Sequence, residues 1–169
     1  MPNRCRGTSG GKLKNELGGD DVPFVPQKTC VFRRQGQKSL FQKICFPGYL
    51  FIESNKPADG FIEPVRPIVY KQKEAYKFLS YGGVGDIAMH EDERVALSKL
   101  LDNDCRIDMS KGFKEGDSVK VISGALVGCE STILKINKNR HEAVIAVKMF
   151  GSMVSISVGF DVIEKIDDV

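Results

Sequence analysis

Five basic side chains gather in the first third of the chain and could bind the phosphates of a nucleic acid. Between Val22 and Ile52 there is no acidic residue, and the basic residues in this stretch are Lys28, Arg33, Arg34, Lys38 and Lys43. The acidic residues concentrate in the middle third, so one face is expected to carry a positive potential that attracts a phosphate backbone. A solvated sheet edge would carry the same charges. Charge alone leaves both interpretations open.

Enzymatic chemistry has no comparable set of residues. His90 and His141 stand apart from any plausible nucleophile, and the sequence contains no P-loop, no Rossmann glycine pattern and no acidic cluster with metal-ligand spacing. Asp92 and Glu93 are interpreted as acids at the start of a helix, not as a catalytic pair. We therefore expect neither an enzyme nor a metal or cofactor site.

The cysteines also argue against a metal site. Five of them are spread over the chain without a C-x-x-C pair, at Cys5, Cys30, Cys45, Cys105 and Cys129. An odd number at wide spacing is not typical of a disulfide framework or of a zinc site. All five are predicted to be reduced and to pack as small hydrophobic side chains.

Composition indicates a soluble globular protein of one or two domains. Of 169 residues, 41% are hydrophobic and 28% are charged, which is too apolar for a disordered chain. No apolar run reaches the roughly 18 residues that a membrane span needs, and the N-terminus does not resemble a signal peptide. The expected location is the cytoplasm, with no membrane partner.

The first hundred residues predict a mixed unit of helices and strands. The expected elements are a weakly structured opening over 1–21, strands at 29–33 and 49–53, a polar hairpin or loop at 34–38, a brief helix interrupted by prolines within 60–66, a strand at 68–70 and a helix at 91–101. The last of these has the strongest signal. Its first turn is acidic, and Ala96, Leu97, Leu100 and Leu101 form an apolar stripe at helical spacing.

Beyond this helix the pattern changes to short strands separated by turns. A linker is expected at 102–111, and the strands are expected at 118–122, 132–137, 143–149, 153–158 and 162–166. Five short strands in about sixty residues suggest a small SH3-like barrel over 112–169, because closing the sheet removes exposed edges.

The start of this second unit carries a glycine pattern. Gly116 and Asp117 form a tight turn before an alternating strand, and Gly124 and Gly128 flank the loop that follows. Glycine is needed where φ is positive or where backbones approach closely, so the pattern predicts a compact strand, loop and strand. It resembles the KOW motif, although that family usually has another glycine at the position of Ser131. The three glycines are also explained by barrel geometry alone.

A second motif lies about seventy residues upstream. Phe46-Pro47-Gly48-Tyr49-Leu50-Phe51-Ile52 resembles the strand entry of the NusG N-terminal (NGN) domain, and Phe24-Val25-Pro26 is similar to that family's F-x-P segment. Both faces of this strand are apolar, so one is expected in the core and the other exposed for a partner. The resemblance implies that Phe46, Pro47, Gly48, Tyr49 and Phe51 bind the clamp of RNA polymerase.

The order of the two motifs is that of NusG-type elongation factors. It implies an α+β fold in which an NGN-like domain with an antiparallel sheet, residues 1–101 with a degenerate opening over 1–21, precedes the KOW barrel. Phe32-Arg33-Arg34-Gln35-Gly36 and Phe150-Gly151-Ser152-Met153-Val154 are most similar to the LoaP class of specialised paralogues. That class is implied to be a processive antiterminator whose basic residues contact an RNA hairpin. The first strand of the NGN domain, which usually holds a Trp-Tyr pair, has no counterpart here.

Two functions of different classes follow. The first is a monomeric, non-enzymatic regulator that binds RNA polymerase and nascent RNA or DNA and suppresses pausing or termination, leaving the barrel free to recruit NusA or the ribosome. The second is a ribosome-associated KOW protein that binds RNA. The second explains the barrel but leaves the aromatic segment at 46–52 without a role.

Overall fold

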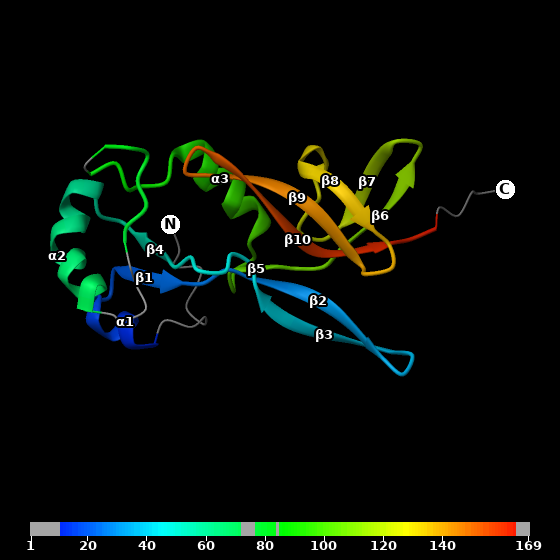
Figure 1. Cartoon of the computed structure of the whole chain (residues 1–169), viewed down its shortest axis with the longest axis horizontal. Helices are drawn as coiled ribbons and strands as arrows, with labels where there is room; N and C mark the ends of the chain where they lie inside the picture. The colour runs from blue at the N-terminus through cyan, green and yellow to red at the C-terminus, as the bar shows by residue number, and fades with distance from the viewer. Residues whose placement is uncertain (1–10, 72–76, 84, 165–169) are drawn as a thin grey trace.

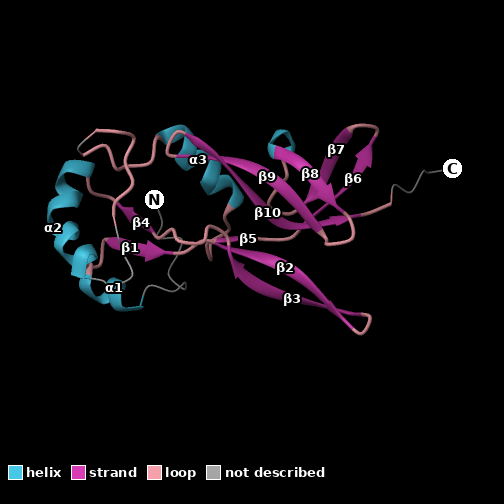
Figure 2. Ribbon diagram, viewed as in Figure 1, coloured by secondary structure: helices cyan, strands magenta, loops and turns pink. Residues whose placement is uncertain are grey.

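The computed structural model describes residues 11–71, 77–83 and 85–164 as an elongated, mixed α+β molecule (Figure 1). The helices are α1 (Gly11–Glu16), α2 (Ala58–Lys71), α3 (Glu91–Leu100) and the short 3-10 helix η1 (Glu130–Thr132). Helices α1 and α2 lie at one end, and a strand-rich unit forms the other end (Figure 2). Among the described residues, none of the helices is long and apolar enough to cross a membrane.

The strands of the first half form two sheets. Strands β1 (Asp21–Phe24) and β4 (Phe51–Ser54) pair antiparallel, while β2 (Gln27–Arg34) and β3 (Gln37–Ile44) form an antiparallel hairpin. No strand of the described residues precedes Asp21, and no ladder joins the two sheets. Pro26, which lacks an N–H, separates β1 from β2. The expected single antiparallel sheet is therefore corrected to two small sheets.

The expected linker at 102–111 contains two strands. Strand β5 (Arg106–Ile107) pairs parallel to β2, and β6 begins at Ser110 within this range. The side chain of Ile107 is fully buried in the core. The segment therefore connects the two halves through backbone pairing with β2 and through the side chain of Ile107 in the shared core.

Helix α2 corrects two further expectations. The brief helix within 60–66 and the strand at 68–70 are parts of one helix, with Pro64 and Pro67 inside it. Four apolar side chains of α2 are buried, namely Phe61, Ile62, Val65 and Val69, and three of them (Phe61, Val65 and Val69) form a cluster with Leu13 of α1. Both prolines lie on the exposed face. Burial of this apolar stripe stabilises the helix by more than the lost backbone hydrogen bonds destabilise it. A prediction from the prolines alone considers only the lost hydrogen bonds. The expected helix at 91–101 is confirmed as α3.

The C-terminal half is a five-stranded sheet. Its strands are β6 (Ser110–Glu115), β7 (Ser118–Ser123), β8 (Ile133–Asn137), β9 (Glu142–Met149) and β10 (Ser152–Val162), in the order β7-β6-β10-β9-β8. Strand β10 contains the strand expected at 153–158, but of the strand expected at 162–166 only Val162 belongs to it. Ile163 and Glu164 are not in a strand, and 165–166 lie outside the described residues. Strand β6 was not expected. Strand β10 pairs with β9 along most of its length and with β6 at its end. Strand β10 therefore joins the β6–β7 pair and the β8–β9 pair into one sheet.

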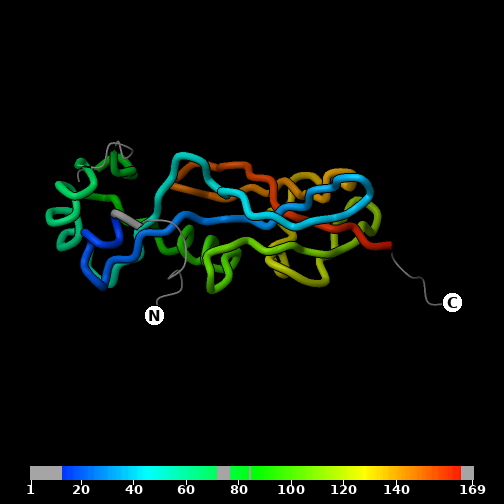
Figure 3. Tube along the Cα trace, turned by 90° about the horizontal axis from the view of Figure 1, so that it is seen from below, coloured from blue at the N-terminus to red at the C-terminus, as the bar shows by residue number. Residues whose placement is uncertain are grey.

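One hydrophobic core runs through both halves. Phe46 and Leu97 from the first half belong to the same buried cluster as Ile145, Val158 and Phe160 from the second. Strand β2 also runs beside β10, as the tube in Figure 3 shows. The C-terminal sheet is thus docked on the first half, while its recruitment of NusA or the ribosome stays a prediction.

Gly159 marks the closest approach of the two halves. A Cβ added there would lie 2.1 Å from Met109 Sδ and 2.5 Å from the carbonyl oxygen of Thr29 in β2. We expect Gly159→Ala to lower the free energy of unfolding by about 1–3 kcal/mol, because the methyl group overpacks this contact. Chemical denaturation measures the change. Gly83→Ala is the control, since its Cβ would meet only Asp86 Cβ at 3.7 Å, and equal effects of the two variants would refute the steric argument.

The cysteines follow the prediction in part. Cys30, Cys45 and Cys129 are free thiols, and burial raises the pKa of the Cys45 thiol to about 12, as expected for a packing residue. Cys105, however, is disulfide-bonded, so the expectation that all five are reduced is wrong for this residue. Cys5 lies outside the described residues. Sequence spacing carried no signal for this bond, because Cys105 becomes a partner only through the fold.

Candidate nucleic-acid interface and apolar surface

The β2–β3 hairpin is an arm that diverges from the C-terminal sheet toward its tip (Figure 1). Its turn residues Gln35 and Gly36 have φ of 50° and 81°, which matches the twist of a two-residue hairpin. Every residue of β3 is exposed. The arm therefore presents its basic side chains on a well-defined scaffold.

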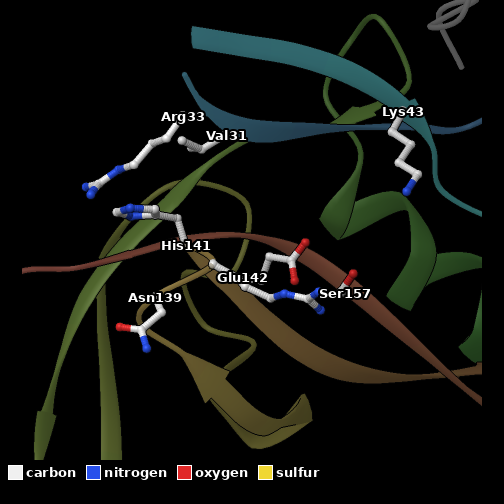
Figure 4. A pocket seen from close by; sticks show the side chains of 8 residues that line it. Val31, Arg33, Lys43, Asn139, His141, Glu142 and Ser157 are labelled. Atoms are coloured by element: carbon white, nitrogen blue, oxygen red, sulfur yellow. The ribbon is translucent and has the colours of Figure 1, made fainter. Parts of the chain in front are cut away.

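A polar cleft separates this arm from the turn that joins β8 and β9. Figure 4 shows Val31 and Arg33 of β2 and Lys43 of β3 facing Asn139, His141 and Glu142 across it. The cleft comprises two adjoining cavities of about 400 and 480 Å³ that share Arg33, Asn139 and His141. Six basic side chains line it, against two carboxylates. The basic ones are Arg33, Lys38, Lys43, Lys111, Lys138 and Arg140.

The two carboxylates do not neutralise this surface. Asp161 pairs with His141 Nδ1 and with Lys38 Nζ at 3.6 Å. Glu142 is the other carboxylate. Within the part of the chain that the structure describes, Arg33, Lys43, Lys138 and Arg140 form no ion pair. These four cations are available to a ligand with negative charge.

The predicted nucleic-acid-binding residues lie in three different environments: in the cleft, on the hairpin outside it, and buried. Arg33, Lys38 and Lys43 line the cleft, while Arg34 is exposed on the same arm outside it. Lys28 is a correction, because it is only 7% exposed and its Nζ donates to the carbonyl oxygen and to Oγ (3.2 Å) of Ser157 in β10. It connects the two halves and cannot reach a ligand.

Three basic residues of the cleft were missed in the sequence, namely Lys111, Lys138 and Arg140. The basic run at the β8–β9 turn was visible, but the C-terminal unit as a whole is charge-balanced. Its relation to the hairpin depends on contacts between distant segments. That juxtaposition, and not the local charge, makes the run part of the cleft.

The segment at 46–52 forms a turn with an exposed apolar tip. The N–H of Tyr49 donates to the carbonyl oxygen of Phe46 (3.2 Å), which closes a four-residue turn with Pro47 and Gly48 at its centre, and Gly48 has the positive φ of 84° that this turn needs. Tyr49 and Leu50 are 38% and 41% exposed. They are the accessible apolar residues of this segment, and Leu50 was not among the predicted contact residues.

Phe46 and Phe51 pack on the core side of this exposed tip. Phe46 is 2% exposed, and its ring centroid lies 5.9 Å from that of Phe51, which stacks on Phe24 at 5.5 Å. The predicted contact role of Phe46 is therefore corrected to a core role, because one face of the segment must be buried. Phe51 is half-buried, and Pro47 and Gly48 are exposed.

The predicted glycine positions have conformations that glycine favours. Gly116, Gly124 and Gly128 have φ of 61°, 96° and 75°. A Cβ on Gly124 would lie 2.1 Å from the carbonyl oxygen of Met109, so this position also needs glycine for space. Asp117 is exposed in the β6–β7 turn. These residues shape the loops of the C-terminal sheet.

Glu93 fixes the orientation of the C-terminal sheet relative to α3. Its carboxylate is 1% exposed and accepts hydrogen bonds from Phe150 N (2.7 Å), Gly151 N (2.9 Å) and Tyr81 Oη (2.6 Å). Tyr81 packs on Phe150 with ring centroids 5.0 Å apart. We call Glu93, Tyr81, Phe150 and Gly151 the latch, because they join α3 to the β9–β10 turn.

The charge of Glu93 is stabilised in this buried position. Burial alone would raise its pKa, but the hydrogen bonds from Tyr81, Gly151 and Phe150 and the nearby Lys148 ammonium outweigh burial, so the pKa lies below its usual value. Burial and the same hydrogen bond to Glu93 raise the pKa of Tyr81, which remains a donor at neutral pH. Near pH 7, Glu93 is thus ionised and accepts the hydrogen bonds of the latch.

Comparison with known proteins shows relatives of one kind. No family model matches the sequence. The chain is 28% identical over 137 residues to the transcription termination/antitermination protein NusG of Borreliella burgdorferi, covering 79% of this chain and 74% of the relative. It is 26% identical over 146 residues to the protein of that name from Thermus thermophilus, covering 84% and 79%. The Xylella fastidiosa protein of the same name is 25% identical over 147 residues, covering 84% and 80%. These relatives support a NusG-family protein.

Proposed function

From these relatives, we propose that the chain is a non-enzymatic transcription factor that binds RNA polymerase and suppresses pausing or termination. Residues 1–101 correspond to an NGN-like domain and residues 112–169 to a KOW-type SH3-like barrel. Tyr49, Leu50, Pro47 and Gly48 form the polymerase-binding surface. Arg33, Arg34, Lys38 and Lys43 contact nascent RNA or DNA. Within the family, the LoaP class of processive antiterminators is the proposed subclass.

The exposed apolar tip carries the polymerase part of the proposal. Tyr49 and Leu50 project from a turn whose buried side, Phe46 and Phe51, belongs to the core. An aromatic and an aliphatic side chain held on a rigid base are typical of a binding anchor, because little side-chain entropy is lost on binding. A factor that binds the elongating polymerase better than the paused enzyme stabilises elongation by that difference in affinity.

A pull-down tests this proposal against the alternative of a ribosome-associated RNA-binding protein. The full chain is immobilised and offered purified core RNA polymerase or purified ribosomes. We expect retention of polymerase. Retention of ribosomes alone would support the alternative. Transcription over a terminator in vitro then measures read-through, which we expect to increase with the protein.

The hairpin contact is tested by the salt dependence of nucleic-acid binding. We expect Arg33→Ala with Arg34→Ala to weaken binding and to lower the slope of log K against log salt by about 0.7 for each phosphate of a single strand that is no longer neutralised. Fluorescence anisotropy with a labelled single-stranded RNA measures the slope. Lys71→Ala with Lys99→Ala makes the same charge change on α2 and α3 and serves as the control. If both pairs lower the slope equally, the arginines only add to the net charge.

A further inference from the structure

The geometry points to a nucleic-acid site with two walls, in which a phosphodiester backbone lies between the hairpin and the turn that joins β8 and β9. This inference rests on the proposed hairpin contact and extends it to the other half of the molecule. The second wall consists of Lys138 and Arg140 from the turn and Lys111 from β6. It assigns to the C-terminal sheet a direct part in nucleic-acid binding.

The second wall has cations without protein partners. Lys111, Lys138 and Arg140 are exposed, and none of them forms an ion pair with another described residue. They line the same two adjoining cavities as Arg33, Lys38 and Lys43 of the hairpin. Like charges on both sides of a cleft repel one another unless an anion lies between them. A phosphate backbone supplies a series of such anions.

The turn that carries this wall is held in place. The N–H of His141 donates to the carbonyl oxygen of Lys138 (3.3 Å), and the N–H of Arg140 donates to Asn137 Oδ1 (3.2 Å). The carbonyl oxygen of His141 accepts from the N–H of Phe160 in β10 (2.8 Å). Because the turn is already ordered, binding a strand there costs little conformational entropy.

The chemistry of the cleft indicates what it binds. Among the described residues, no Phe or Tyr lines either cavity, and the one ring that does, His141, is paired with Asp161, so the cleft offers bases little surface for stacking. The basic side chains instead match phosphates, with Asn139 as an additional donor and acceptor. Binding should therefore depend strongly on salt and weakly on base sequence.

The cleft also requires the two halves to stay docked. Its walls come from distant parts of the chain and are held together by Lys28 on Ser157, by the close approach at Gly159 and by the latch at Glu93. Of these residues, none except Ser157 lines the cleft. Lys28, Gly159 and Glu93 are positioning residues, which set the distance between the walls without touching the ligand.

The test measures binding of the full chain to three fluorescein-labelled probes by anisotropy. The probes are a 20-nucleotide single-stranded RNA, an RNA hairpin and a DNA duplex, which share the backbone and identify the polymer that occupies the cleft. We expect Lys138→Ala with Arg140→Ala to weaken binding of the preferred probe about tenfold, as for two exposed ion pairs. On a single strand the salt slope should fall by about 1.4. Lys114→Ala with Lys120→Ala is the matched control, since both lysines are exposed on the same sheet outside the cleft.

The outcomes distinguish this inference from the proposed function. If Arg33→Ala with Lys43→Ala weakens binding while Lys138→Ala with Arg140→Ala behaves like the control, the second wall is refuted and the hairpin contact stands. If the unmodified protein binds none of the probes, the proposed nucleic-acid contact fails, and the second wall fails with it.

A substitution in the latch separates the effect of docking on RNA affinity from the effect of charge, because the two effects have opposite signs. Glu93→Gln removes a negative charge, so long-range electrostatics alone would tighten binding of the RNA probe. If docking positions the walls, the same variant should weaken binding although it leaves every lining side chain intact. Circular dichroism confirms that the variant is folded. Tighter binding by the folded variant would overturn the positioning role.

Discussion

Glu93→Ala should lower the free energy of unfolding by about 3–5 kcal/mol, a large part of the stability of a protein of this size. The substitution leaves Phe150 N, Gly151 N and Tyr81 Oη without their shared acceptor in a buried place. It also removes the main polar link between α3 and the C-terminal sheet. Urea denaturation followed by circular dichroism measures the change.

Asp92→Ala is the matched control for this latch. Asp92 is the preceding residue on α3, and it is exposed and pairs with Lys148 Nζ at 3.1 Å. Because that pair lies in solvent, the melting temperature should hardly change. Equal losses in the two variants would show that Glu93 acts only as one more acid in the first turn of α3.

Acid should weaken the latch in a defined direction. The pKa of Glu93 is lowered by folding, so its contribution to stability is complete above its ordinary value near 4.5 and is lost as the pH falls through the lower folded value. Glu93→Gln cannot titrate. The difference in stability between the two proteins should therefore shrink below about pH 4.5. A difference that stays constant down to pH 3 would contradict this assignment.

Tyr49→Ala is expected to reduce the affinity for core RNA polymerase by about thirtyfold or more. An aromatic anchor at the centre of an interface contributes about 2 kcal/mol or more, which corresponds to that factor. Tyr49 is 38% exposed in the free protein, so the variant should unfold at nearly the same denaturant concentration. Biolayer interferometry with immobilised polymerase measures the affinity.

Tyr70→Ala controls for the loss of an exposed aromatic ring. Tyr70 is 57% exposed and lies on α2, which carries none of the proposed contact residues. Its removal should leave the affinity within about twofold. If Tyr49→Ala binds polymerase as tightly as Tyr70→Ala does, the apolar tip is not the docking surface, and the proposed function loses its main structural support.

Local patterns predicted those elements whose signals agree with one another. Helix α3 has acids at its start and an apolar stripe, and it lies where the sequence placed it. Helix α2 was divided wrongly into a short helix and a strand, because proline rules are local while the burial of Phe61, Val65 and Val69 on α1 is not. Strand β5 was missed because two residues acquire their pairing only from β2.

The candidate site likewise has features that the local sequence predicted and others that depend on tertiary contacts. The sequence identified the basic arm and the aromatic turn, because a run of charges and a Pro-Gly pair are each formed by residues that are close together in the sequence. It could not decide which side chains face solvent, so Lys28 and Phe46 were assigned to binding although both are buried. It also missed Lys138 and Arg140, which become part of the cleft only when the C-terminal sheet docks.

The sequence by itself determined which side chains are present for binding: a basic stretch between Val22 and Ile52 and the apolar segment at 46–52. It also determined most of the strands and turns, since their hydrophobic period and glycine positions are local properties. Only the tertiary structure decided that the two halves share one core, that Glu93 joins them and that a basic cleft lies between them. Each of these features depends on contacts between residues far apart in the chain, and such contacts arise when the whole chain minimises its exposed apolar surface.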